Sequence, residues 1–190
     1  YQERDAVQNV DAAHACFRLG DVLHAKGYYE EAERLLRKAL STKEGIRGSN
    51  HPRIAEILNV LAAVLESRGK LQEAEEAGRR ALAISEQSFG PDASDTATSL
   101  HSLGAVLLAR NETQQAGELL ARALRIRESV LGADHPDTLT SREVLGEHAI
   151  RLGDFEQAES YLRDALAARE RRLGPDYPPL AENLNNLAFA

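Results

Sequence analysis

Histidine, cysteine and acidic side chains are the residues of this chain that could bind a metal or catalyse a reaction. Six histidines are present, but no two of them lie four residues apart, which is the spacing of a zinc-peptidase helix. Glu147-His148 has the Glu–His order of such a helix without its second histidine. The histidines therefore predict no metal site. His51 and His135 stand in equivalent turns, which indicates a structural role for both.

The single cysteine, Cys16, does not have the setting of a nucleophile. Its equivalents 42 and 84 residues further on are Leu58 and Leu100, so we expect it to act as a small core hydrophobe. One cysteine cannot form an internal disulfide, which favours a reducing compartment. No glycine-rich phosphate loop follows a strand pattern, because the chain has no convincing strand pattern. The sequence thus predicts neither an enzyme nor a cofactor.

Composition narrows the partners of the chain. Of the 190 residues, 43% are hydrophobic and 28% are charged, which is typical of a soluble protein. The net charge of −7 argues against nucleic acid, because phosphate binding needs clustered Lys and Arg. No apolar run is long enough to span a bilayer and no signal-peptide pattern is present, so we expect a cytoplasmic protein. The absence of methionine predicts that the chain is part of a larger protein.

A repeat of 42 residues organises the whole chain. The segment Gly27-Tyr28-Tyr29-Glu30-Glu31-Ala32 recurs with variations at residues 69–74, 111–116 and 153–158. Fixed periods of this length are typical of stacked arrays, in which each unit buries its apolar face against its neighbours. Such arrays present an extended surface rather than a catalytic pocket.

Two helices per repeat follow from the positions of apolar and small residues. Leu61, Leu103 and Leu145, like Leu19 before them, are each followed by Gly or Ala, which allows a neighbouring backbone to approach closely. Apolar residues at i, i+3 and i+7 around these leucines form the stripe of a first helix, and alanines and leucines form the stripe of a second. Second helices are expected to end at Gly48, Gly90, Gly132 and Gly174. We predict helices over residues 5–26, 29–47, 52–68, 71–89, 94–110, 113–131, 136–152, 155–173 and 178–190.

The pattern resembles the tetratricopeptide repeat (TPR). The Leu–small pair in the first helix and the Gly-x-x-x-x-Ala turn are shared with that family, whose usual period is 34 residues. The longer period, with Ala123-Leu124, Glu128 and the turn Leu131-Gly132-x-Asp134-His135-Pro136, resembles the repeats of kinesin light chains. The resemblance implies an all-α, right-handed α-solenoid of antiparallel helix hairpins, with about four and a half repeats in one domain over 1–190. The repeats would span about 10–51, 52–93, 94–135 and 136–177, and residues 178–190 would form the first helix of a further repeat or a capping helix.

The resemblance also implies where a ligand lies. In TPR arrays the first helices line the concave face, and peptides bind there. The matching positions predict a peptide-binding groove lined by Phe17, Asp21, His24, Glu56, Asn59, Glu66, His101, Leu108, Glu143, Glu147, Ile150, Arg151, Asn185 and Phe189.

Acidic residues dominate this predicted groove. Asp21, Glu56, Glu66, Glu143, Glu147 and Glu182 face a single base, Arg151, whereas the second helices carry nearly balanced charge. We therefore expect a non-enzymatic interaction scaffold that binds a protein or peptide segment carrying Lys or Arg, because complementary charge selects partners. The alternative that these acids only keep the face solvated remains open.

Other functions that the resemblance suggests match fewer residues. Kinesin light chains bind acidic cargo peptides through paired asparagines, and here only Asn185-Asn186 keeps the pair. Repeats that bind the acidic tails of heat-shock chaperones use Lys, Asn and Arg on the concave face. At the matching positions of this chain, only Asn59 is a residue of one of these types. Two further alternatives stay open, namely a regulatory or sensor region of a larger enzyme or signalling NTPase, and self-association through the terminal helix.

Overall fold

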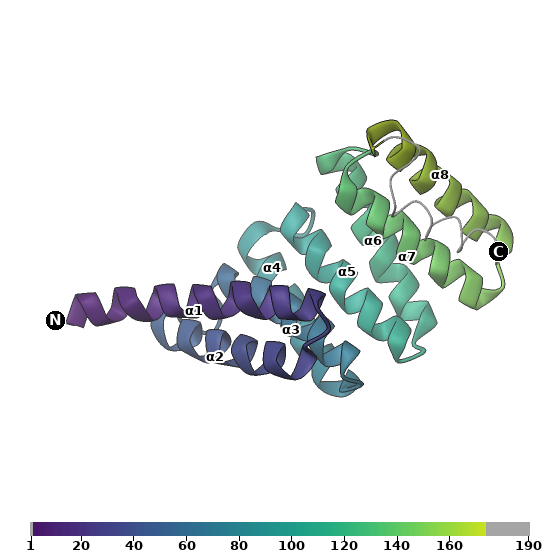
Figure 1. Cartoon of the computed structure of the whole chain (residues 1–190). Coiled ribbons are helices and arrows are strands. Elements are labelled where there is room, and N and C mark those ends of the chain that lie inside the picture. The colour runs from purple at the N-terminus through teal and green to yellow at the C-terminus, as the bar shows by residue number, and fades with distance from the viewer. Residues whose placement is uncertain (1, 174–190) are drawn as a thin grey trace.

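The computed structural model describes the backbone of residues 2–173 and the side chains of residues 10–171, and within this part the chain forms eight helices and no strand (Figure 1). Five of the eight helices have the predicted bounds, and the other three differ by one to three residues at an end. The predicted helix over 178–190 lies outside the described residues. The helices are α1 (Gln2–Ala25), α2 (Tyr29–Arg47), α3 (Pro52–Ser67), α4 (Leu71–Phe89), α5 (Ser94–Ala109), α6 (Thr113–Leu131), α7 (Pro136–Leu152) and α8 (Phe155–Leu173).

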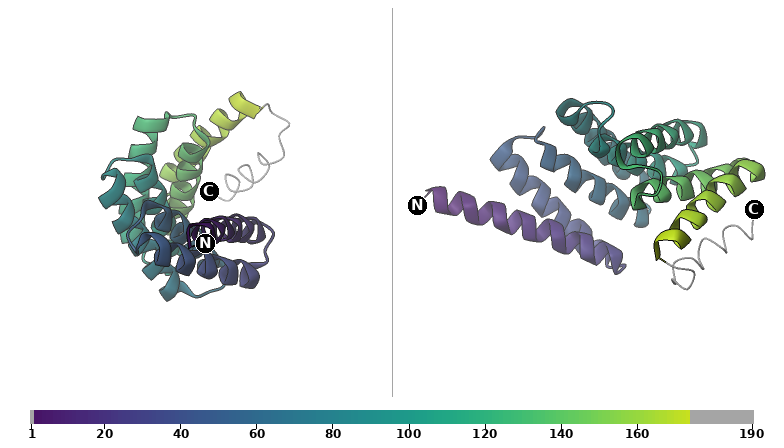
Figure 2. Two further views of the ribbon diagram at one scale, coloured as in Figure 1. Left: turned by 90° about the vertical axis from the view of Figure 1, so that its left-hand side faces the viewer. Right: turned by 90° about the horizontal axis from the view of Figure 1, so that it is seen from above.

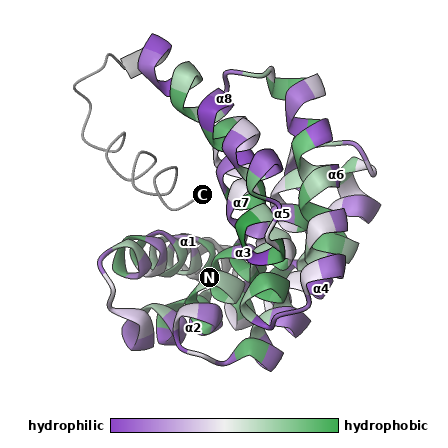
Figure 3. Cartoon of the chain, turned by 90° about the vertical axis from the view of Figure 1, so that its right-hand side faces the viewer, coloured by the Kyte–Doolittle hydropathy of each residue, from purple (hydrophilic) through white to green (hydrophobic). Residues whose placement is uncertain are grey.

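Consecutive helices pair as hairpins that stack along an arc, as expected of an α-solenoid (Figure 2). Each of the second helices α2, α4 and α6 packs against the first helix of its own hairpin and against the first helix of the next. Apolar residues face each other between the stacked helices, while the turns and outer faces are mostly hydrophilic (Figure 3). This arrangement buries a row of core clusters along the array, without a closed centre.

The turns between hairpins contain the predicted capping residues. Gly48, Gly90 and Gly132 end α2, α4 and α6 with φ between 80° and 91°, a conformation that side chains other than glycine rarely adopt. At the following helix starts, Nδ1 of His51 and of His135 each accepts a hydrogen bond of 3.2 Å from the backbone N–H two residues on. The structural role predicted for these two histidines is thus confirmed.

Small residues allow the two helices of each hairpin to approach closely, as the sequence predicts. A Cβ atom added to Gly104 would lie 2.7 Å from Cγ of Leu120, and one on Gly146 would lie 2.8 Å from Cγ of Leu162. In the second hairpin the sizes are exchanged, because Ala62 occupies the glycine position and Gly78 the leucine position. A Cβ atom added to Gly78 would lie 3.2 Å from Cδ1 and 3.4 Å from Cα of Leu103, so this glycine packs closely against α5 of the next hairpin.

One expected core leucine lies at the surface. Leu61, Leu103 and Leu145 are at most 4% exposed, but the equivalent Leu19 is 49% exposed. In the later repeats this column is covered by the second helix of the preceding hairpin. No described helix covers that side of α1, so the prediction that Leu19 is buried is wrong for the described residues.

Candidate ligand-binding face

The first helices α1, α3, α5 and α7 lie on the inner side of the arc. α3 packs against α5, with weaker contacts from α1 to α3 and from α5 to α7, whereas second helices make no comparable contacts with each other. We call the side formed by these four helices the concave face. Hydrogen bonds tie its helices together, since Asn59 Nδ2 donates to Ser99 Oγ (3.0 Å) and Ser102 Oγ donates to the carbonyl of Asn59 (3.3 Å).

Most predicted groove residues are partly accessible on this face. Phe17, Asp21, His24, Asn59 and Ile150 are half-buried, and Glu147 and Arg151 are exposed. Leu108 is a correction, because it is 4% exposed and packs in a core cluster with Leu103 and Leu145, so it offers no surface to a ligand. Asn185 and Phe189 lie outside the described residues.

Two of the predicted groove acids are engaged by arginines of the chain itself. Nη1 of Arg53 donates to both carboxylate oxygens of Glu56 at 2.9 Å. Nε and Nη2 of Arg169, on α8, donate to the two oxygens of Glu143 at 2.8 and 2.7 Å. Neither arginine belongs to the predicted groove set. The excess of acid on the concave face is therefore smaller than the first helices alone suggest.

Glu66 is an acid of this face whose burial is only partly compensated. Its side chain is half-buried near the C-terminal end of α3, and it accepts no hydrogen bond from another described residue. Burial raises the pKa of Glu66, and the charge of Arg151 opposes that effect only in part. Arg151 itself donates from Nη1 to the carbonyl of Leu108 at 2.8 Å. Glu66 is thus a partly desolvated carboxylate without a direct cationic partner in the described part of the chain.

His101 is unsuited to act as a switch near neutral pH. Burial, reinforced by the positive charge of Arg127, lowers the pKa of His101 to about 4. Its Nδ1 atom is buried and has no hydrogen-bond partner among the described residues. His101 is therefore a neutral imidazole under ordinary conditions, and it belongs to the floor of the concave face.

Second helices also contribute to this floor, which the sequence reasoning missed. The equivalent positions Lys43, Ser85, Arg127 and Arg169 follow the core alanines Ala39, Ala81, Ala123 and Ala165 by four residues, so they lie on the same helix face. Lys43 is only 9% exposed and Arg127 only 5%. The signal was present in the sequence as a basic residue recurring at a position where a purely structural stripe would be apolar.

Two pockets open at this floor, and they are copies of one another. One pocket, of about 440 Å³, is lined by residues of α3, α4 and α5 that include Asn59, Ser85 and Phe89. The other, of about 410 Å³, is lined by the residues one repeat earlier, Phe17, Lys43 and Arg47, together with residues of α1 and α3. The repeat therefore presents the same cavity twice with different chemistry.

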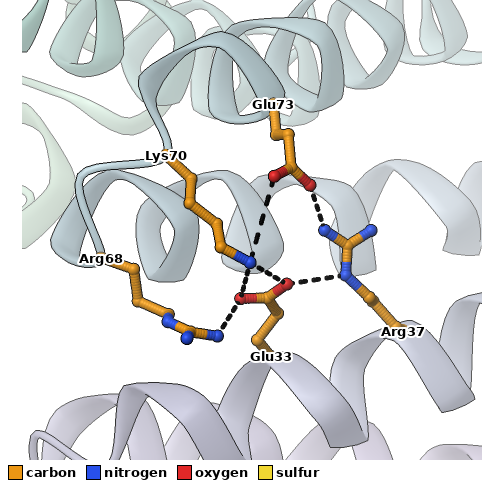
Figure 4. Close-up of polar contacts among 5 residues, drawn as sticks. All are labelled: Glu33, Arg37, Arg68, Lys70 and Glu73. Atoms are coloured by element: carbon orange, nitrogen blue, oxygen red, sulfur yellow. Dashed lines mark hydrogen bonds and ion pairs between the residues drawn. The ribbon is translucent and has the colours of Figure 1, made fainter.

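A cluster of charged residues lies away from the concave face and joins neighbouring hairpins. Glu33 on α2 accepts hydrogen bonds from Arg37 (2.8 Å), Lys70 (2.9 Å) and Arg68, and Arg37 also pairs with Glu73 (Figure 4). Burial alone would raise the pKa of Glu33, but hydrogen bonds from the three cations outweigh it and hold the pKa at about 2.

Only part of this cluster recurs along the array. In the next repeat Glu75 pairs with Arg79 and Arg110 in the same way. One repeat further the acid is replaced by Gly117, and the His148 ring occupies the space, with Nε2 2.8 Å from the carbonyl of Thr113. These ion pairs join neighbouring hairpins and have a structural role.

Sequence comparison identifies the repeat. The tetratricopeptide repeat profile matches residues 11–87, 53–129, 95–171 and 143–190, so its first three matches begin 42 residues apart. The chain belongs to the tetratricopeptide repeat family. Repeats of this family generally act as protein–protein interaction scaffolds, and the predicted fold class is thereby confirmed. None of the curated proteins matches the chain in sequence.

Solved structures of similar fold include kinesin-light-chain-like TPR proteins. The nearly identical TPR-like repeats of a kinesin light chain-type protein from Podosopora anserina align with a TM-score of 0.75 and 24% identity, over 92% of this chain and 83% of that one. BtubC (BKLC) from P. vanneervenii aligns with a TM-score of 0.75 and 21% identity, over 98% and 82%. Pseudomonas aeruginosa pilF aligns at 0.67 and 23%, over 96% and 70%. At these identities the TPR fold is what is shared.

The described part of this TPR array contains neither a candidate metal-binding cluster nor a candidate membrane-spanning helix. Residues 2–173 contain no group of three or more His, Cys, Asp or Glu side chains placed to hold a metal ion. None of the described helices combines the length and apolar character needed to cross a membrane.

Proposed function

We propose that this TPR array is a non-enzymatic scaffold whose concave face holds a protein segment with a basic side chain opposite Glu66. The support is the state of Glu66, a half-buried carboxylate with a raised pKa and no hydrogen-bond donor among the described residues. A ligand Lys or Arg beside it would compensate its lost hydration and favour its charged form.

The scaffold itself supplies shape rather than movement. Its inner helices are fixed by the stacked core and by hydrogen bonds such as Asn59–Ser99, so little ordering of the receptor accompanies binding. Half-buried Ile150, in the same column as Glu66 but two repeats further along the array, adds apolar surface for another part of the ligand. Charge then selects the partner and shape holds it.

Glu66 is the cleanest position at which to test this. Reversing Glu143 would break its two hydrogen bonds to Arg169, so a loss of binding there would have a structural explanation. Glu66→Gln removes the charge, keeps the shape and breaks no hydrogen bond or ion pair among the described residues. Glu118→Gln on α6 is the matched control, since Glu118 is an exposed acid on a second helix.

The experiment is selection of peptides from a random displayed library on the intact 190-residue protein. We expect selected peptides to be enriched in Lys and Arg and to bind more weakly as salt is raised. Glu66→Gln should lower their affinity about tenfold, in line with a charge-assisted hydrogen bond of about 1.5 kcal/mol, while Glu118→Gln leaves it unchanged. Peptides that bind independently of salt and of Glu66 would contradict the proposal, as would a failure to select any.

A further inference from the structure

One side of α1 is open at positions that are covered on the other first helices. Leu61 and Val64 of α3 are at most 2% exposed, and their equivalents on α5 and α7 are at most 8% exposed, because the preceding second helix packs there. The equivalents on α1, Leu19 and Val22, are 49% and 47% exposed. Two more apolar residues of the same side, one and two turns earlier, are also exposed, namely Ala15 and Ala12. Among the described residues, α1 therefore presents the apolar stripe of a first helix without a second helix on it.

Ion pairs accompany this packing at each junction, by which we mean the contact between a second helix and the hairpin that follows it. Glu33 of α2 binds Arg68, the residue after α3. Glu75 of α4 binds Arg110, the residue after α5. At the third junction both the acid and the cation are replaced, by Gly117 and Leu152. The two members of this pair are thus present or absent together.

A second ion pair joins the same elements about three turns further along the second helix. Glu44 binds Arg80 of the next second helix at 2.5 Å, and Glu86 binds Arg122 at 2.8 Å. At the third junction an arginine of α7, Arg142, binds the equivalent acid instead. A complete junction therefore has an apolar stripe with an acid–cation pair toward each end.

The first hairpin carries the cations of such a junction without the acids. Lys26, the residue after α1, stands in the column of Arg68. Lys38 of α2 stands in the column of Arg80. Both lysines are exposed, and the side chain of neither is hydrogen-bonded or ion-paired with another described residue.

The last described helix, α8, carries the matching acids at the other end of the array (Figure 1). Glu159 stands in the column of Glu33, and like Glu33 it pairs with an arginine one turn later in its own helix. Its side chain is nevertheless 49% exposed. Glu170 stands in the column of Glu44, is exposed and has no partner among the described residues. Residues 174–190 contain no Lys or Arg, so this segment supplies no cation to either acid.

We propose that α8 of one copy of this chain docks on the open side of α1 of a second copy, so that the arrays join head to tail. Glu159 of one copy would pair with Lys26 of the other. Glu170 would pair in the same way with Lys38, and the apolar stripe of α8 would cover the open side of α1. The contact continues the junctions already present within the chain, and it does not depend on the proposed function. The docked α1 takes the place beside α8 that the repeat pattern gives to residues 178–190.

The test is sedimentation velocity of the intact 190-residue protein over a range of concentrations. A head-to-tail contact joins two different surfaces, so each added copy leaves a free end and the assembly grows beyond a dimer. Association should be weak, because one helix junction is a small interface, and it should weaken further as salt is raised. Leu19→Asp should leave the protein monomeric. Val130→Asp is the matched control, because Val130 is 54% exposed on α6, and it should associate like the wild type.

An exchange of charges tests the pairing itself. Lys26→Glu and Glu159→Lys each place like charges at the contact, so each variant alone should associate about tenfold more weakly than the wild type. In an equal mixture of the two variants, every contact between unlike copies has one acid and one lysine, so association should return to the wild-type strength.

Three results would overturn the proposal. They are a protein that stays monomeric at every concentration, an assembly that stops at a dimer, and a mixture of the two variants that associates no better than either alone. Monomeric protein would mean that another element covers α8. Binding of peptides on the concave face should be the same in all these variants, so the proposed function is tested separately.

Discussion

Gly104→Ala is expected to destabilise the array although alanine is the better helix former. An added Cβ would lie 2.7 Å from Cγ and 2.8 Å from Cδ2 of Leu120, which is fully buried. Overpacking of this kind costs about 1–3 kcal/mol, and replacing glycine by alanine within a helix returns about 1 kcal/mol. The net effect should lie between about 0 and 2 kcal/mol of lost stability.

The sign of the effect should reverse when the opposing leucine is shortened. In a Leu120→Ala background the clash is gone, so Gly104→Ala should stabilise by about 1 kcal/mol relative to that background. The second hairpin already carries an alanine, Ala62, at the glycine position, together with a small residue, Gly78, at the leucine position. Gly45→Ala is the control, since a Cβ there meets nothing within 4 Å and should only strengthen α2.

Urea unfolding followed by circular dichroism measures these differences, with midpoints and slopes compared across the four variants. The Gly146–Leu162 contact of the fourth hairpin provides an independent copy of the cycle. If Gly104→Ala stabilised the protein equally in both backgrounds, glycine would not be required for close packing. The explanation of the Leu–small column would then fail.

Three further predictions concern charge. Glu33→Gln should destabilise the array by about 1–2 kcal/mol above pH 4.5, because three cations lose the acid to which they are hydrogen-bonded. The loss stays moderate because those cations are partly exposed to solvent. Since the folded pKa of about 2 lies below the ordinary 4.5, this contribution should vanish as pH falls from 4.5 toward 2, and equal acid sensitivity of wild type and Glu33→Gln would contradict it. NMR should show His101 titrating near pH 4. Because its folded pKa is below the ordinary 6.5, the burial of His101 should lower the stability of the array only as pH falls below 6.5. A titration midpoint near 6.5 would refute the desolvation of His101. Peptide affinity that depends on Glu66 should fall as pH is lowered through the raised pKa of that residue, and a pH-independent difference between wild type and Glu66→Gln would count against the pair.

The fold was predictable because the same pattern of residues recurs in every repeat. The periodic leucines, the glycines in the turns and the small residues of the hairpins place helix ends to within a few residues, since each position is supported by several copies. The one misplaced core residue, Leu19, lies where no described neighbour covers α1. Periodicity gives the type of packing for each column but does not show whether a neighbour is present.

The candidate site was less predictable because partners come from other helices. The sequence assigned Glu143 to the concave face but could not show that Arg169, 26 residues later, binds its carboxylate. Leu108 was assigned to the face by its column, yet it packs inward. The buried Lys43 belongs to a second helix, so a reading restricted to first helices could not find it.

The most direct test of the central claim is an NMR map of the intact protein with the tightest selected peptide bound. The proposed function predicts that the largest backbone shift changes fall on the inner helices α1, α3, α5 and α7, around Asn59, Glu66 and Ile150. Changes confined to the outer surfaces of α4, α6 and α8 would contradict the assignment of the concave face as the binding site.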